Sequence, residues 1–219
     1  MRDALQIFLL AFPALFSIVN PLGGGFMFLN ITRRLSHDDR EWLARWIAIY
    51  SLILLNASIY IGAYVLSFLG ISLPALRIAG GLVIALMAWR LLDASDDDNA
   101  ADEDANALRK GNIESAAFYP LTMPLTTGPG SISVAVALGT SRPLELDRFF
   151  GFALGATLAI ALVVALVYVT YRWCDRLSEL IGRTGTAIIL RLSAFLLFCI
   201  GIEVLTVGLA GWLAPLLAR

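Results

Sequence analysis

The sequence predicts an all-α integral membrane protein with six transmembrane helices, arranged as two inverted repeats of three helices. Hydrophobic residues make up 59% of the 219 residues and charged residues only 15%, whereas soluble domains are about half apolar and about a quarter charged. Six apolar windows reach the length of about 20 residues that a membrane helix needs. They cover residues 4–31, 46–69, 73–92, 116–140, 149–171 and 188–213.

The first window is expected to remain in the protein as a membrane span. It is longer than the apolar core of a secretory signal peptide, and no small-residue cleavage site precedes the NPLGGG motif within it.

The link between the third and fourth windows differs from the other links because it is strongly acidic. It holds Asp93, Asp96, Asp97, Asp98, Asp102, Glu103 and Asp104. Such a run cannot bury itself and predicts a solvated linker. A calcium loop is the alternative, but the spacing lacks the central glycine and terminal glutamate of an EF-hand. We therefore predict a first repeat at 1–92, an acidic cytoplasmic linker at 93–115 and a second repeat at 116–219.

The distribution of lysine and arginine predicts the orientation. The first, third and fifth links carry ten of these residues, and the opposite side carries four. Because cytoplasmic links are enriched in positive charge, the odd-numbered links are expected in the cytoplasm. Both termini then lie on the periplasmic side of a bacterial inner membrane.

The two halves of the chain share matching motifs. LRIAGGLVIAL (76–86) begins the third span, and LRLSAFLLFCI (190–200) begins the sixth; NPLGGG (20–25) lies in the first span, and MPLTTGPG (123–130) lies in the fourth. A repeat with an odd number of spans must insert its second copy upside down, which predicts an inverted pair. The alternative is a chance likeness between apolar helices.

The paired Pro-Leu motifs predict that helices 1 and 4 are discontinuous. Pro21 lacks a backbone donor, and Gly23, Gly24 and Gly25 tolerate conformations that other residues avoid. The fourth span repeats the pattern with Pro124, Gly128, Pro129 and Gly130. Two interrupted helices in corresponding places indicate the binding site of a transporter. Proline kinks with glycine-mediated packing are the alternative.

Such a site is expected to bind a small neutral molecule. A free helix N-terminus suits a carboxylate, and free C-terminal carbonyls suit an ammonium group or a small cation, so a zwitterionic amino acid fits both. The side chains near the two motifs are small and uncharged: Ser17, Asn20, Thr122, Thr126, Thr127, Ser131 and Ser133.

Three charged residues inside the spans are candidates for coupling or gating. Glu203 is the acidic residue that lies deep in a predicted span, and an intramembrane carboxylate suggests a role in proton transfer. Its alternatives are a pair with an arginine such as Arg77, a backbone hydrogen bond, or a position near the outer water. Sodium held by carbonyls with Asn20 or Thr126 competes with proton coupling. Arg77 and Arg191 either reach the membrane interface or serve as gates.

We expect no enzymatic activity and no cofactor beyond a coupling ion. The lone histidine, His37, excludes an H-E-x-x-H metal site, and the lone lysine, Lys110, lies outside the spans. A P-loop motif is also absent from the sequence. Cys174 and Cys199 are interpreted as inert thiols.

The chain resembles the MarC family of six-span inner-membrane proteins. The resemblance rests on NPLGG (20–24), LRIAGGLVIA (76–85), PLTMPLTTGPGSI (120–132) and RLSAFLLFCIGIE (191–203). Members of the SnatA type are transporters of glycine and alanine driven by an ion gradient, with the substrate at two interrupted helices. The resemblance implies such a site at Asn20, Pro21, Gly23, Thr126, Thr127, Gly128 and Gly130.

The sequence therefore favours an ion-coupled transporter of small neutral amino acids, with Gly24 and Ser131 added to the residues expected at its site. Its expected partners are the amino acid, membrane lipid and a second copy of the chain, and nucleic acid is not expected. The alternatives are an exporter or channel for another small metabolite, and a non-transporting membrane scaffold that docks partners through the acidic linker.

Overall fold

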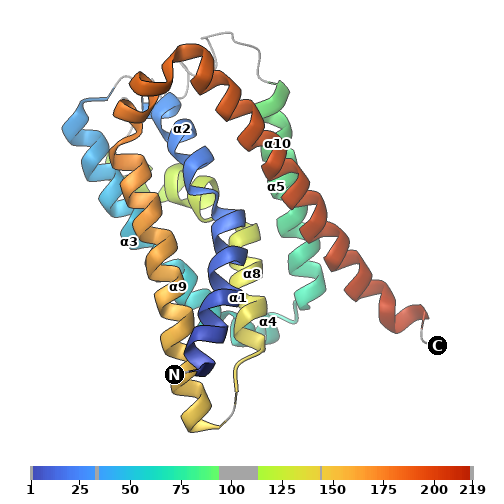
Figure 1. Cartoon of the computed structure of the whole chain (residues 1–219). Helices are drawn as coiled ribbons and strands as arrows, with labels where there is room; N and C mark the ends of the chain where they lie inside the picture. The colour runs from blue at the N-terminus through green and yellow to red at the C-terminus, as the bar shows by residue number, and fades with distance from the viewer. Residues whose placement is uncertain (1, 33–34, 94–112, 144, 218–219) are drawn as a thin grey trace.

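The computed structural model describes residues 2–32, 35–93, 113–143 and 145–217. Every regular element in these ranges is a helix, which confirms the predicted all-α class (Figure 1). The elements are α1 (Arg2–Val19), α2 (Pro21–Thr32), α3 (His37–Tyr60), α4 (Gly62–Phe68), α5 (Leu73–Asp93), α7 (Ile113–Ala116), η1 (Ala117–Thr126), α8 (Pro129–Thr140), α9 (Leu146–Arg172) and α10 (Cys174–Leu217).

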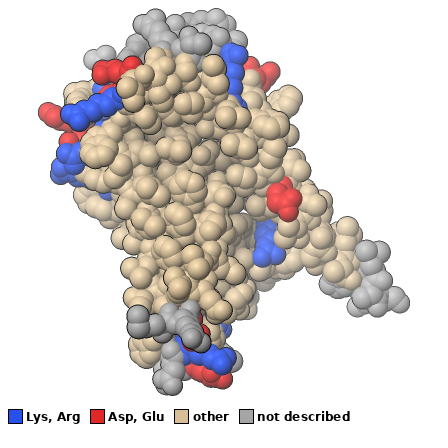
Figure 2. All heavy atoms as spheres, viewed as in Figure 1, with Lys and Arg blue, Asp and Glu red and all other residues tan. Residues whose placement is uncertain are grey.

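The described helices are long and apolar enough for a protein that spans the membrane. Five spans qualify singly, and a sixth is obtained if the bent pair Ile113–Thr126 and Pro129–Thr140 is counted as one span. On the face shown in Figure 2, charged side chains gather at the two ends of the bundle, and the band between them carries almost none. This pattern is expected where hydrocarbon surrounds the middle of the protein.

The second predicted window, 46–69, was wrong in its bounds. Helix α3 begins at His37 and ends at Tyr60, and the shorter α4 follows it. Ser36 caps α3, since its Oγ accepts a hydrogen bond from the Asp39 amide at 3.1 Å. The acidic side chains of Asp38 and Asp39 interact favourably with the positive end of the helix dipole and stabilise the start of α3. The polar first turns lowered the local hydropathy and hid this start.

Close glycine contacts join the helices. A Cβ on Gly155 of α9 would lie 2.3 Å from the Ala4 carbonyl oxygen of α1, and one on Gly81 of α5 would lie 2.5 Å from the Leu205 amide nitrogen of α10. Helices in lipid associate mainly through such close backbone approach. Helices α5 and α10 therefore pack as a pair at one side of the bundle, with α1, α3 and α9 at the other and α8 between the two groups (Figure 1).

The predicted acidic linker lies mostly outside the described residues, because 94–112 are not among them. Helix α5 ends at Asp93, and α7 begins at Ile113.

Candidate functional site

The first Pro-Leu motif coincides with a one-residue interruption between α1 and α2. Asn20 has a positive φ of 46°, which is uncommon for a residue other than glycine. Its Oδ1 accepts a hydrogen bond from the Gly23 amide at 3.2 Å and so caps the start of α2. The Asn20 amide donates to the Phe16 carbonyl at 2.9 Å. The helical hydrogen-bond pattern is therefore interrupted over a short stretch only, and Asp3–Thr32 still qualifies as one span.

The second motif lies at a sharper change of direction. Segment η1 and helix α8 meet at 68°, with Thr127 in a non-helical conformation and Gly128 extended. Two threonine hydroxyls of η1 add hydrogen bonds to its backbone carbonyls. Thr122 Oγ1 donates to the Ala117 carbonyl at 2.6 Å, and Thr126 Oγ1 donates to the Leu121 carbonyl at 2.7 Å. These bonds reduce the cost of irregular backbone at membrane depth.

A cavity of about 290 Å³ lies between the two motifs. Its walls come from α1, α2, α5, η1, α8 and α10. Seven of the residues predicted for substrate binding, coupling or gating line it: Asn20, Gly23, Gly24, Thr126, Gly128, Ser131 and Arg191. The two motifs, more than 100 residues apart in the chain, thus contribute to one compartment.

Four residues predicted for the site do not line this cavity. Ser17 is exposed on the outside of α1. The Pro21 carbonyl accepts a hydrogen bond from Thr170 Oγ1 at 3.1 Å, and Thr127 Oγ1 donates to Ser51 Oγ at 2.8 Å in a buried contact. Gly130 lies behind Ile84, whose side chain forms part of the wall. Pro21, Thr127 and Gly130 thus support the walls rather than face the space.

Arg77 and Glu203 also lie away from the cavity lining. Arg77 is near the start of α5 and is partly exposed, and Glu203 is exposed on α10. Their roles in gating and coupling stay predictions from the sequence.

The structure adds lining residues that the sequence did not indicate, among them Asn30, Met87 and Ser193. Ser193 packs closely on the first motif, because a Cβ on Gly23 would lie 2.6 Å from Ser193 Cβ. These residues lie on helices α2, α5 and α10 at positions without proline or glycine signals. Their leucine- and alanine-rich surroundings gave no reason to select them.

The electrostatics of the cavity suit a polar molecule that carries a negative group. Helix α8 begins at the wall with Gly128 as its N-cap, and no side chain caps it. Exposed amides at a helix N-terminus attract anions. Arg191 is the charged residue among the described lining residues. Carbonyl, hydroxyl and amide groups of Asn20, Thr126 and Ser193 supply further hydrogen-bonding capacity.

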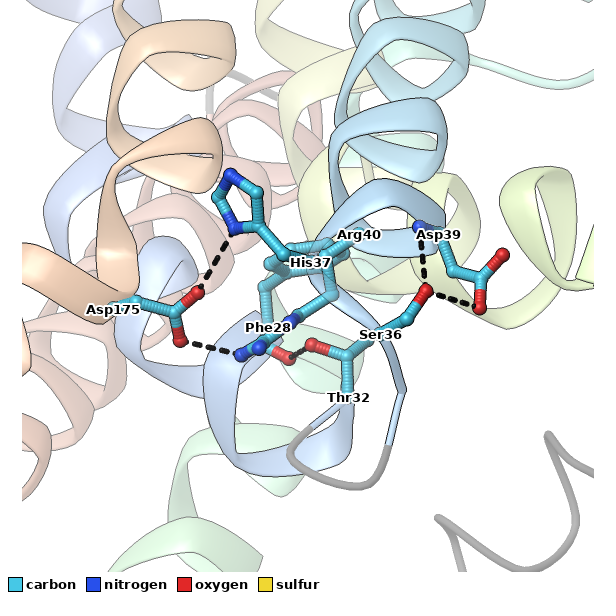
Figure 3. Close-up of polar contacts among 7 residues, drawn as sticks. All are labelled: Phe28, Thr32, Ser36, His37, Asp39, Arg40 and Asp175. Carbon is cyan, nitrogen blue, oxygen red and sulfur yellow. Dashed lines mark hydrogen bonds and ion pairs between the residues drawn. The ribbon is translucent and has the colours of Figure 1, made fainter.

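A second polar cluster lies at the end of the bundle where α3 and α10 begin (Figure 3). The Asp175 carboxylate contacts the Arg40 guanidinium and lies 3.5 Å from His37 Nδ1. Nearby, Glu41 forms an ion pair with Arg172 at 3.1 Å. Among the described residues no group of histidine, cysteine or acidic side chains forms a metal site. The ion pairs of this cluster hold α3 against the junction of α9 and α10.

The chain is similar to curated membrane proteins over nearly its whole length. It is 32% identical to a UPF0056 membrane protein of Methanocaldococcus jannaschii over 208 residues, covering 94% of this chain and 98% of that one. It is 30% identical to a UPF0056 membrane protein of Buchnera aphidicola over 212 residues, covering 97% and 96%. It is 29% identical to the UPF0056 inner membrane protein MarC of Escherichia coli (strain UTI89) over 213 residues, covering 95% and 96%.

No solved structure matches the chain significantly. The model of the MarC family of integral membrane proteins matches residues 5–213. On this match and on the relatives above, the chain belongs to the MarC family of integral membrane proteins.

Proposed function

We propose that the protein is a secondary transporter of small neutral amino acids such as glycine and alanine, located in the bacterial inner membrane and coupled to an ion gradient. The observation that carries this proposal is the cavity between the two Pro-Leu motifs, where both helical interruptions contribute to the wall. Irregular backbone at membrane depth is tolerated where it lines a cavity, and transporters place their substrates there.

The packing of the helices supports an inverted repeat. The first span contacts α9, and correspondingly the bent fourth span contacts α3. Helix α2 contacts α10, and correspondingly α8 contacts α5. In Figure 1 the chain rises from α1 to α2 but descends from η1 to α8. This exchange of partners with reversed direction is what a two-fold axis in the membrane plane gives.

The size and chemistry of the cavity favour a small substrate. Its volume of about 290 Å³ lies at the lower end of pockets for drug-sized molecules, which begin near roughly 300 Å³. The amides at the start of α8 and the Arg191 side chain favour the substrate carboxylate. Asn20 and Thr126 line the same space, and oxygen ligands of this kind suit an ammonium group or a sodium ion.

The cavity extends toward the end of the bundle where α2 and α5 finish, because Asn30 and Leu91 belong to its lining. The excess of lysine and arginine in the odd-numbered links favours a cytoplasmic location for this end. In this orientation the cavity is accessible from the cytoplasm. Transport then requires a second conformation in which the cavity opens to the periplasmic side.

Uptake into liposomes tests the proposal. Purified protein in liposomes is expected to accumulate radiolabelled glycine or alanine under a proton or sodium gradient, with saturation. Ser193→Leu is expected to abolish uptake because the larger side chain enters the cavity, whereas the matched Ser17→Leu on the exposed side of α1 is expected to retain it. Folded protein that transports neither amino acid contradicts the proposal. Flux that needs no coupling ion and does not saturate indicates a channel.

A further inference from the structure

Helices α5 and α10 touch each other backbone to backbone at several levels. A Cβ on Gly201 of α10 would lie 2.6 Å from the Ala85 amide nitrogen of α5, and one on Gly208 would lie 2.8 Å from the Ile78 amide nitrogen. Membrane helices that approach this closely are held by extensive van der Waals contact. Helix α5 and residues 185–214 of α10 therefore form one unit, which we call the α5–α10 pair (Figure 1).

A different set of contacts joins the other helices to one another. The Tyr60 hydroxyl of α3 lies 2.8 Å from Thr157 Oγ1 of α9, and Gly139 of α8 packs directly on the Ile59 carbonyl of α3. Helix α1 packs on α9 at Gly155, and hydrogen bonds join α9 to α2 and to η1. We call this second unit, made of α1, α2, α3, η1, α8 and α9, the frame.

The pair meets the frame mainly at the two segments that follow the Pro-Leu motifs. Helix α5 contacts α8, where a Cβ on Gly80 would lie 3.0 Å from the Pro129 carbonyl oxygen, and α10 contacts α2, where Ser193 lies against Gly23. The cavity lies along this boundary, because α5 and α10 supply part of its lining and the frame supplies the rest. A rotation of the pair against the frame therefore changes the shape of the cavity.

A glycine with positive φ precedes each helix of the pair. Gly70 has a φ of 69° in the link before α5, and Gly182 has a φ of 77° just before the span Gly185–Ala214. These are the glycines with positive φ in the part of the chain that the structure describes. A Cβ on either would meet no atom within 4 Å, so neither link is confined by packing there. The turn of α10 before Gly182 stays with the frame, since Asp175 pairs with Arg40.

We propose that the α5–α10 pair turns as one rigid body against the frame, about Gly70 and Gly182, and so opens the cavity to alternate sides of the membrane. This inference rests on the proposed transport function. Hinges in proteins are typically a few loop residues that absorb the change in φ and ψ. The moving body then consists of the third span of each repeat. One half of the chain cannot rock against the other, because α5 is packed on α10 and α1 on α9.

A disulfide within the pair tests its rigidity. A Cβ on Gly211 of α10 would lie 3.8 Å from Pro74 Cβ of α5, which matches the usual Cβ separation in a disulfide. The variant Pro74→Cys with Gly211→Cys, made with Cys174→Ser and Cys199→Ser, is expected to form this bond on oxidation, with loss of both free thiols by mass spectrometry. Uptake of alanine into liposomes is expected to stay within about twofold of the reduced protein.

Two results of this experiment contradict the proposal. Loss of uptake that a reductant restores shows that α5 and α10 must move against each other during transport. Failure of the bond to form contradicts the contact on which the pair depends. Elution as a single peak in detergent checks that the variant is folded.

Distances between spin labels test the motion itself. Cysteines replace exposed residues in the same cysteine-free background: Ile188 of α10 with Ile49 of α3 across the boundary, Ile188 with Leu86 of α5 within the pair, and Ile49 with Leu162 of α9 within the frame. In liposomes, the first distance is expected to divide between two values about 5 Å or more apart, and saturating alanine is expected to change their ratio. The other two distances are expected to vary by less than about 2 Å.

The outcomes separate the moving pair from the transported substrate. A first distance with a single value in both conditions overturns the proposal, and so does a distance within the pair that changes as much as the first. Protein that takes up no alanine, but in which only the first distance has two values, contradicts the proposed substrate and supports the moving pair.

Discussion

The hydroxyl groups of Tyr171 and Thr126 lie 2.8 Å apart in the buried centre of the protein. Tyr171 belongs to α9, and its ring stacks on Phe28 of α2 with 4.7 Å between the ring centroids. A Cβ on Gly24 would lie 2.6 Å from the Tyr171 oxygen. One aromatic ring thus connects α9 with both segments that line the cavity.

Removing the Tyr171 hydroxyl and removing the Thr126 hydroxyl are expected to destabilise the protein by different amounts. Tyr171→Phe loses one net hydrogen bond, about 1 kcal/mol, and Thr126 keeps its bond to the Leu121 carbonyl. Thr126→Val leaves the buried Tyr171 hydroxyl without this partner and is expected to cost more, ~1–3 kcal/mol. Thermal unfolding in detergent measures the difference, and equal or reversed losses would contradict the arrangement.

Gly130 is expected to be sensitive to even a single methyl group. A Cβ there would lie 1.8 Å from Ile84 Cδ1, so Gly130→Ala must displace the cavity wall. We expect uptake to fall at least tenfold. Ile84→Ala removes the clashing atom and is expected to recover part of the loss in the double variant. A Gly130→Ala variant with unchanged uptake would show that this wall is not rigid.

The contact between Arg40 and Asp175 is expected to contribute measurably to stability. The Arg40 side chain is 16% exposed and that of Asp175 27%. Asp175→Asn should therefore cost more than the roughly 1 kcal/mol of an exposed pair but less than the roughly 3 kcal/mol of a buried one. Arg148→Ala, which removes the exposed pair with Glu145, provides the control. Similar melting temperatures for both variants would contradict this ranking.

Cys174 is expected to resist alkylation at neutral pH. Burial, together with a smaller contribution from the neighbouring Asp175 carboxylate, raises the pKa of its thiol to about 11, although Arg40 opposes the shift. The raised pKa keeps the thiol neutral well above pH 8, and only the thiolate reacts readily. In Cys199→Ser, maleimide labelling should be slow at pH 8 and rise about tenfold per pH unit toward pH 11. Fast labelling at pH 8 in the folded protein would contradict this.

The cavity position followed from the sequence because its walls depend on residues with unusual backbone chemistry. Proline beside glycine in an apolar run is costly in a plain membrane helix, so Asn20 and Gly128 could be selected in advance. Ser193 and Met87 could not, because nothing local distinguishes them from other lining or lipid-facing residues of α5 and α10. Only the packing of these helices against the interrupted spans brings them to the cavity.

Two other differences between expectation and structure have local causes. Ser17 is small and polar and lies near Asn20 in the sequence, which predicts it at the site, but Ile18 and Val19 occupy the side of α1 that faces the cavity. Helix α3 begins before the predicted window because its first turns carry Asp38, Asp39 and Glu41. Such residues stabilise a helix N-terminus while they lower the apolar signal of a span.

A structure determined with saturating glycine or alanine tests the central claim most directly. The account predicts density for the amino acid in the cavity between the two motifs, with its carboxylate near the start of α8 and Arg191, and with contacts to Asn20 and Thr126. An empty cavity at saturating amino acid, or a ligand bound elsewhere in the protein, would contradict it.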